Sequence, residues 1–251
     1  PLQEAIEYFR SRNDDEKARL LKYRKKKTLS LYRLGERMDY HHGFMVPSTG
    51  YLKRFDLVLA DGGFTIRYPR QHTANQLMPM PEYPKLLVTF RQYGNWLSKL
   101  GIENVGALNE AIEAKRAAEI VLVSEAFHEQ NLSQIARDIS GRLDRSHLIL
   151  VAGPSSSGKT TFARRLTVQL LALGVSPFPL ELDNYFLPRN EAPLDEYGKP
   201  DFEAIEGLNL ELLAEHLQKM IGGEKVQLPR YNFKVGKSEA GEVIQLKPGQ
   251  P

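Results

Sequence analysis

Residues 153–160 read Gly-Pro-Ser-Ser-Ser-Gly-Lys-Thr, and this stretch constrains the fold more than any other part of the chain. It fits the pattern G-x-x-x-x-G-K-[ST], in which glycines let the backbone turn until successive N–H groups point into one concavity. A helix that begins at the end of such a loop adds its partial positive charge beneath a bound phosphate. The predicted nucleotide-binding residues are therefore Gly153, Ser155, Ser156, Ser157, Gly158, Lys159, Thr160 and Thr161.

The segments around this loop are of the kinds that the motif requires. Residues 147–152 form a short apolar run, which predicts a buried strand. Residues 160–173 carry apolar side chains at helical spacing, and Gly174 stands where such a helix should end. Strand, loop and helix in this order favour phosphate binding over the alternative, a turn rich in serine and glycine. We expect Lys159 to reach the β- and γ-phosphates, and the Thr160 hydroxyl to hold Mg²⁺.

A candidate catalytic base follows the next predicted strand. Residues 178–182 should pair in parallel with the first strand, since a helix joins the two. Ligands in open α/β sheets lie at the carboxyl ends of strands, so Asp183 should lie near the loop. Its carboxylate can accept the proton of a substrate hydroxyl that attacks the γ-phosphate. The alternative is an aspartate that begins a turn before Asn184.

Composition excludes several other classes of protein. The chain has 251 residues, 41% hydrophobic and 26% charged, which is ordinary for one large or two modest globular domains. A net charge of +3 is too weak to argue for nucleic acid. Without cysteine there is no disulfide and no thiolate chemistry. No apolar run approaches the roughly 18–20 residues that span a membrane. Both ends have the character of cuts, so we expect a fragment of a longer protein.

The patterns along the chain predict three parts. Residues 1–105 form an α+β domain, residues 106–145 a helical connector of one or two helices, and residues 146–251 the N-terminal part of a phosphate-loop domain. Within the first part, helical patterns cover residues 1–27 and 86–100, and residues 51–60 and 64–68 predict a hairpin.

The part from Ser146 resembles the uridine kinase and phosphoribulokinase family on four ordered motifs. These are residues 153–161, Leu-Asp-Asn-Tyr-Phe at 182–186, Pro-Asp-Phe-Glu-Ala-Ile-Glu at 200–206 and Leu-Pro-Arg-Tyr-Asn-Phe at 228–233. The resemblance implies that Asp183 is the catalytic base and that Lys159 acts with it. It also implies that the third motif contacts a ribose and the fourth packs around a nucleoside base. The implied substrate-binding residues are Phe186, Phe202, Glu203, Tyr231 and Phe233.

The chain departs from the family pattern at informative places. The ribose-binding aspartate is Glu203 here, and a base-contacting histidine falls on Gly236. A site that loses a hydrogen-bond partner discriminates poorly, so uridine is a weaker expectation than phosphoryl transfer itself. For Tyr231 and Phe233 the alternative is a role as core aromatics on a strand. The family's later Glu-Gly strand and arginine lid do not occur in this chain, so we expect weak nucleotide binding and little turnover.

The N-terminal part resembles the extension that some bacterial kinases share with threonyl-tRNA synthetase editing-side (second additional) domains. The resemblance rests on residues 39–51. The synthetase domain uses H-x-x-x-H with a distant Cys and His, whereas His41 and His42 are adjacent and no cysteine is present. Adjacent residues on a strand point to opposite faces, so we expect hydrogen-bonding or surface histidines rather than a metal site. The basic run at residues 22–27, with Tyr23, is either a solvated helix end or an RNA contact.

The sequence thus predicts an α/β fold, with a P-loop NTPase-type parallel sheet that is incomplete at the C-terminus and preceded by an α+β domain. The predicted activity is ATP-dependent transfer of the γ-phosphate to a hydroxyl of a nucleoside or sugar-like small molecule, with ATP and Mg²⁺. We expect a cytoplasmic homo-oligomer with no membrane association. The alternative is an RNA-associated or regulatory nucleotide-binding protein that uses the loop as a switch.

Overall fold

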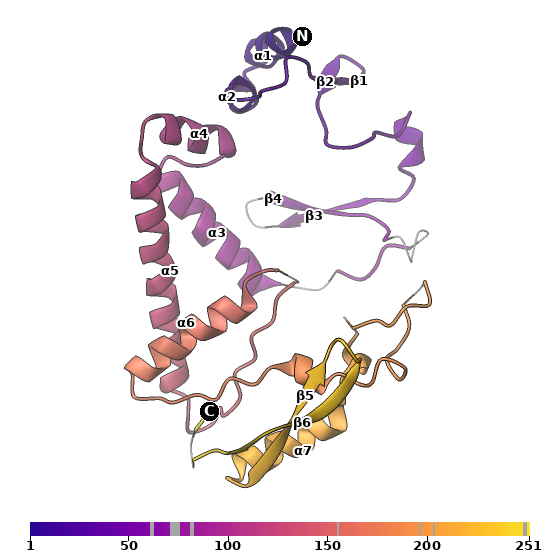
Figure 1. Cartoon of the computed structure of the whole chain (residues 1–251). Helices are drawn as coiled ribbons and strands as arrows, with labels where there is room; N and C mark the ends of the chain where they lie inside the picture. The colour runs from indigo at the N-terminus through magenta and orange to yellow at the C-terminus, as the bar shows by residue number, and fades with distance from the viewer. Residues whose placement is uncertain are drawn as a thin grey trace. The chain divides into compact units, whose positions relative to one another are not determined.

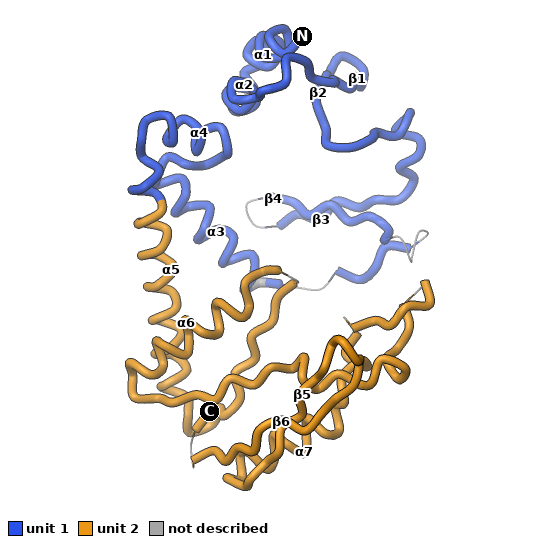
Figure 2. The backbone as a smooth tube through the Cα atoms, viewed as in Figure 1, with its two compact units in different colours: residues 1–120 blue, residues 121–251 orange. Residues whose placement is uncertain are grey.

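Helix α5 (Ala117–Ser140) carries the chain from the first to the second of two units in the computed structural model (Figure 1). The units comprise residues 1–120 and 121–251, and each is described by itself (Figure 2). The structure describes the whole chain except the side chain of Pro84 and residues 61–62, 71–75, 81–82, 155, 196, 203 and 248–249. Two predicted site residues, Ser155 and Glu203, therefore lie outside the described residues.

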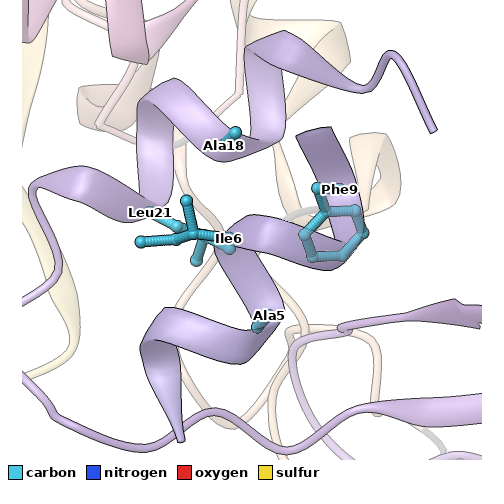
Figure 3. Packing of buried hydrophobic residues seen from close by; sticks show 5 residues of the cluster. All are labelled: Ala5, Ile6, Phe9, Ala18 and Leu21. Atoms are coloured by element: carbon cyan, nitrogen blue, oxygen red, sulfur yellow. The ribbon is translucent and has the colours of Figure 1, made fainter. Parts of the chain in front are cut away.

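The first unit begins with two helices that pack through a small apolar core. Helices α1 (Leu2–Ser11) and α2 (Asp15–Lys22) replace the single helical stretch predicted over residues 1–27. Asn13 breaks the stretch, because its φ of 60° is incompatible with a continuous right-handed helix. The core side chains recur every three or four residues, so they share one face of each helix. They are Ala5, Ile6, Phe9, Ala18 and Leu21 (Figure 3).

Two hairpins follow in the same unit. Strands β1 (Tyr32–Leu34) and β2 (Arg37–Asp39) pair across a turn that contains Gly35. After a 3₁₀ turn, η1 (Thr49–Tyr51), strands β3 (Asp56–Ala60) and β4 (Gly63–Arg67) pair in register, which confirms the predicted hairpin.

The unit's remaining helices are α3 (Pro84–Lys99) and α4 (Val105–Glu113). Helix α3 confirms the helical pattern at residues 86–100. Helix α4 contacts α2, and at the start of the basic run the Tyr23 hydroxyl donates to Glu113 Oε2 at 2.7 Å. Lys22 Nζ donates to the same oxygen at 3.4 Å, so the first two side chains of the run contact protein. Among the described helices of the chain, none has both the length and the apolar run that crossing a bilayer requires.

In the second unit, α5 packs against α6 (Lys159–Ala172), the helix predicted after the loop. The buried residues of the cluster that joins them are Leu132, Ala136, Leu166, Leu170 and, after the end of α6, Val175. At the rim, Arg165 Nη2 donates to Glu125 Oε2 at 2.9 Å and Arg165 Nε donates to Glu129 Oε1 at 2.7 Å. Apolar packing and a charged rim therefore fix the helix that begins at the loop.

The rest of the second unit is a helix against a hairpin. Two 3₁₀ turns, η3 (Leu182–Tyr185) and η4 (Ile205–Gly207), precede α7 (Leu210–Ile221). Strands β5 (Lys225–Asn232) and β6 (Lys237–Gln245) then pair antiparallel, with an irregularity between Gln227 and Pro229. The buried side chains between α7 and the hairpin are Met220, Val226 and Leu228.

The predicted parallel sheet is not confirmed. The sheets that the structure describes are all two-stranded and antiparallel, and neither residues 147–151 nor residues 178–181 belong to a strand. The apolar side chains of these segments pack elsewhere: Ile149 lies against the α5–α6 core, and Phe178 and Leu180 against the α7–hairpin core. Parallel strands are stable chiefly inside larger sheets that are covered on both faces, so a lone pair has little to hold it.

Candidate active site

The described residues of the loop, 153–154 and 156–160, include two in the left-handed backbone region. Gly158 caps α6 with a φ of 88°, and Ser156 has a φ of 59°. Residues in this left-handed region reverse the chain, so that neighbouring N–H groups point inward. A Cβ added at Gly153 would lie 2.8 Å from Ser157 Oγ, so a larger residue there would displace the Ser157 side chain. A phosphate fits this part of the chain, because the first N–H groups of α6 also lack helical partners.

Lys159 lies at the first position of α6 and is turned back over the loop. Its Nζ donates to the carbonyl oxygens of Gly153, at 2.8 Å, and Pro154, at 2.9 Å. In the part of the chain that the structure describes, no carboxylate pairs with this ammonium. Its positive charge is therefore available to an anion in the loop.

Thr160 and Thr161 lie exposed in the first turn of α6. Neither hydroxyl hydrogen-bonds to another described residue, so both can accept a new partner. Mg²⁺ prefers oxygen ligands and usually keeps several waters, so a single protein hydroxyl beside bound phosphates suits it. Among the residues with described positions, no group of three His, Cys, Asp or Glu side chains comes close enough to hold a metal.

A hollow of about 420 Å³ lies beside the loop, between α5 and α6. Its floor is apolar, with Ile135, Ile149 and Phe162, and its polar edge is formed by Ser157 and Lys159. Ligand pockets in proteins are typically about 300–1,000 Å³ with apolar walls and a few polar groups, so the hollow has the size and lining of a binding site.

Asp183, the predicted base, lies in η3 with an exposed side chain. Its carboxylate accepts no hydrogen bond and forms no ion pair within the described residues, and its place in a turn with Asn184 also agrees with the alternative interpretation, so its role as the base stays a prediction. The next side chain is tied down, because Asn184 Oδ1 accepts the N–H of Tyr231 on β5 at 3.2 Å. No hydrogen bond in the described structure joins Asp183 to the loop, so their proximity remains a prediction.

The structure brings four of the five predicted substrate-binding residues together in one aromatic cluster: Phe186, Phe202, Tyr231 and Phe233. The ring of Phe186 is central, with centroids 5.2 Å from Phe202, 5.7 Å from Tyr231 and 6.3 Å from Phe233. All these contacts are edge-on, the arrangement that aromatic quadrupoles favour.

Two members of the aromatic cluster differ in burial. Phe233 is 57% exposed, which a core aromatic would not be, whereas Tyr231 is only 5% exposed. The Tyr231 hydroxyl is buried and has no hydrogen-bond partner within the described part of the chain. Such an unpaired group costs free energy until something binds it. The core interpretation therefore fits the ring of Tyr231 but explains neither its hydroxyl nor Phe233.

Sequence reasoning missed a buried pair beneath Asp183. Tyr185 Oη and His216 Nδ1 are joined by a hydrogen bond of 3.1 Å between η3 and α7. Burial lowers the pKa of His216 and raises the pKa of Tyr185, so both side chains stay neutral near pH 7. The signal was present in the sequence, since His216 interrupts the apolar face of its helix beside Leu217 and Met220.

Sequence reasoning also missed Arg189. Its Nη2 donates to the carbonyl of Phe233 at 2.9 Å, and its N–H donates to the carbonyl of Gly236 at 2.9 Å. The Arg189 side chain covers the place where a Cβ on Gly236 would lie, with its own Cβ at 3.0 Å. The glycine that departs from the family pattern is thus needed for this packing.

The two adjacent histidines of the first unit contact different rings. His41 lies 6.1 Å from Tyr32 and His42 lies 6.5 Å from Tyr40, measured between ring centroids. Both imidazoles are exposed. Neither histidine lies in a strand, so the argument from alternating strand faces does not apply to them, although their ring contacts differ.

Comparison with known proteins places the resemblance in the second unit. Residues 148–247 match the model of the Phosphoribulokinase / Uridine kinase family. A uridine kinase of Halobacterium salinarum is 29% identical over 99 residues, which are 39% of this chain and 43% of the relative. A uridine kinase of Brevibacillus brevis is 35% identical over 101 residues, 40% of this chain and 46% of the relative.

The family model does not cover the first unit. The chain spans less than half the length of these curated relatives, and no solved structure matches it. The loop, the Asp183 turn and the aromatic cluster all lie within the matched residues. The second unit thus carries a segment that is similar to the phosphoribulokinase and uridine kinase family.

Proposed function

We propose that the second unit holds the nucleotide loop and the acceptor site of an ATP-dependent phosphotransferase, which acts on a hydroxyl of a nucleoside or sugar-like small molecule. The observation that carries this proposal is the aromatic cluster at Phe186, Phe202, Tyr231 and Phe233. These residues lie far apart in the sequence, yet they meet around the turn that carries Asp183. A switch needs only phosphate and metal groups, whereas an acceptor needs a surface on which to bind.

The residues divide the chemistry between them. Asp183 accepts the proton of the acceptor hydroxyl while the hydroxyl oxygen bonds to the γ-phosphorus and the bond from that phosphorus to the β-phosphate oxygen breaks. The products are the phosphorylated acceptor and ADP. Lys159 leaves the carbonyls of Gly153 and Pro154 and donates to phosphate oxygens, where negative charge is concentrated.

The Thr160 hydroxyl would hold Mg²⁺, which neutralises phosphate charge when it is bound. The fit rests on the exposed, unpaired hydroxyl at the start of α6 and on the loop before it, with its two residues in the left-handed backbone region. The aromatic cluster would bind the flat or apolar face of the acceptor and exclude water from the reacting hydroxyl.

The test is a panel of nucleosides and sugars with ATP and Mg²⁺, with the whole chain as enzyme and ADP formation as the readout. We expect acceptor-dependent ADP formation that is slow, in keeping with the little turnover expected from the sequence. Asp183→Asn should lower turnover by about 10²- to 10⁴-fold and leave ATP binding unchanged. Asn184→Asp is a poor control because the side-chain oxygen of Asn184 accepts the N–H of Tyr231; Asp144→Asn, at an exposed position, is a better one.

The other outcomes separate the remaining candidates. Nucleotide binding without acceptor-dependent ADP formation would favour the regulatory alternative. RNA binding lost on charge reversal of Lys25–Lys27 would favour the RNA-associated one. The synthetase-like character of residues 1–105, homo-oligomerisation and a cytoplasmic location stay predictions.

A further inference from the structure

The turn that carries Asp183 is held from three directions. Asn184 Oδ1 accepts the N–H of Tyr231 on β5. The carbonyl of Tyr185 accepts the N–H of Asn209, at the start of α7, at 2.7 Å. Phe186 pairs with Leu208 in an isolated antiparallel bridge. Asp183 itself has no such tether, so its direction is set by the residues that follow it.

Tyr185 is the most deeply placed of these neighbours. It is 1% exposed, and its ring meets the ring of His216 edge-on at 5.7 Å. His216 is 8% exposed. Among the residues whose side chains are described, it is the buried polar one. A buried imidazole and a buried phenol each cost free energy if unpaired, so their mutual hydrogen bond holds both at one separation.

The geometry of a 3₁₀ turn makes this anchor consequential. Successive side chains of a turn with three residues per revolution lie about 120° apart. When Tyr185 points into the unit toward α7, Asp183, two residues earlier in the same turn, must point elsewhere, and Phe186 leaves the turn directly after Tyr185 with a φ of −59° and a ψ of 141°. Asp183 is exposed accordingly, and Phe186 enters the aromatic cluster. Rotation of Tyr185 would redirect the proposed base and the proposed acceptor surface together.

We propose that His216 is a positioning residue for phosphoryl transfer: it fixes Tyr185, and Tyr185 fixes the turn that directs Asp183 and Phe186. The inference rests on the proposed function, in which Asp183 is the base. Neither His216 nor Tyr185 touches the reacting atoms in this account. Their contribution is orientation, which matters because a displacement of about 1 Å at a reacting group can cost about 100-fold in rate.

Three variants test the role of His216: two remove the hydrogen bond between His216 and Tyr185, and one restores a hydrogen-bonding group. Tyr185→Phe removes the phenol hydroxyl and His216→Leu removes the imidazole, and each leaves its partner unpaired. His216→Asn returns a hydrogen-bonding group near the position of Nδ1. The matched control is Met220→Ala, which opens a cavity one turn later in the same helix and removes neither partner of the hydrogen bond.

The first measurement is steady-state phosphotransfer by the whole chain. We expect Tyr185→Phe and His216→Leu to lower kcat by about 10- to 100-fold with the KM for ATP unchanged. His216→Asn should recover most of the loss, and Met220→Ala should lose thermal stability but keep kcat. Wild-type kcat in His216→Leu would overturn the proposal, and so would an equal loss of kcat in Met220→Ala.

The second measurement does not depend on activity. The amides of Leu187 and Asn209 donate to Gly207 and Tyr185 around the turn, so their hydrogen exchange reports its opening. Both amides should exchange faster in His216→Leu and recover in His216→Asn, with no selective change in Met220→Ala. If the wild type phosphorylates no acceptor, the proposed function fails, and this exchange pattern alone decides whether the pair holds the turn. Unchanged exchange in His216→Leu would refute that role.

Discussion

The loop and the aromatic cluster are built by different physical means. The loop depends on backbone conformation, with Gly158 and Ser156 at positive φ and α6 beginning at once behind them. Its side chains are largely exposed. The aromatic cluster depends on packing, with rings from three separate segments and a buried pair beneath them. Replacing a side chain of the loop should therefore change mainly the charge offered to a ligand. Replacing a side chain at or behind the aromatic cluster should change mainly the free energy of unfolding.

The largest expected effect is on stability behind the cluster. Leu228 is 8% exposed in the core between α7 and the hairpin. Leu228→Ala should lower the free energy of unfolding by about 2–5 kcal/mol, because it removes buried contacts and leaves a cavity. Urea denaturation measures this. ATP affinity should stay at the wild-type value under native conditions, and a parallel loss of affinity would show that the two sites are not separable.

At the loop, Lys159→Met should lower turnover while leaving stability almost unchanged. Loss of the ammonium should lower turnover by about 10²- to 10³-fold, since a charged donor to the transferring phosphate is gone. The free energy of unfolding should change by less than about 0.5 kcal/mol, because the side chain lies at the surface of the loop. Lys199→Met, on an exposed loop, is the control. A large stability loss in Lys159→Met would mean that the ammonium holds the loop together.

Tyr231→Phe addresses the unpaired hydroxyl. Its removal should raise the free energy of unfolding by about 1 kcal/mol, because a buried polar group without a partner is lost. If an acceptor uses this hydroxyl, the KM for the acceptor should rise in the same variant. Tyr197→Phe, at a position that is 70% exposed, should do neither. Destabilisation of Tyr231→Phe would mean that the hydroxyl already has a partner.

The smallest expected effect is a dependence of stability on pH. Burial lowers the pKa of His216 in the folded protein, whereas the unfolded chain keeps a value near about 6.5. The unfolded state therefore binds a proton first as the pH falls. The contribution to stability is complete above about pH 6.5 and is lost as the pH falls through the lower pKa of the folded state. Urea midpoints between pH 7.5 and 5 should fall more in the wild type than in His216→Asn. Parallel profiles would contradict this.

The sequence predicted the local elements well and the tertiary ones poorly. The loop, helix α6 and the β3–β4 hairpin follow from spacing and turn residues alone, because each is set by neighbours in the chain. The parallel sheet does not follow, since strand formation at residues 147–152 needs partners that the segment itself does not supply.

In the candidate site, too, the features set by neighbours in the chain were predicted, and the contacts between distant residues were not. The family resemblance predicted the members of the aromatic cluster but not their edge-on packing around Phe186. His216 was missed because a single histidine on an apolar helix face has no evident role until its hydrogen-bond partner is known. That partner, Tyr185, is 31 residues away.

The position of Lys159 has a consequence for how a nucleotide would bind. Its ammonium already donates to two carbonyl oxygens, so a move to two phosphate oxygens leaves the number of its hydrogen bonds unchanged. The move replaces the attraction between the ammonium and two carbonyl dipoles with the stronger attraction between the ammonium and negatively charged phosphate oxygens. That attraction is screened by salt at an exposed site. Nucleotide affinity should therefore fall with rising ionic strength, and should do so much less in Lys159→Met, where the charge that benefits is gone.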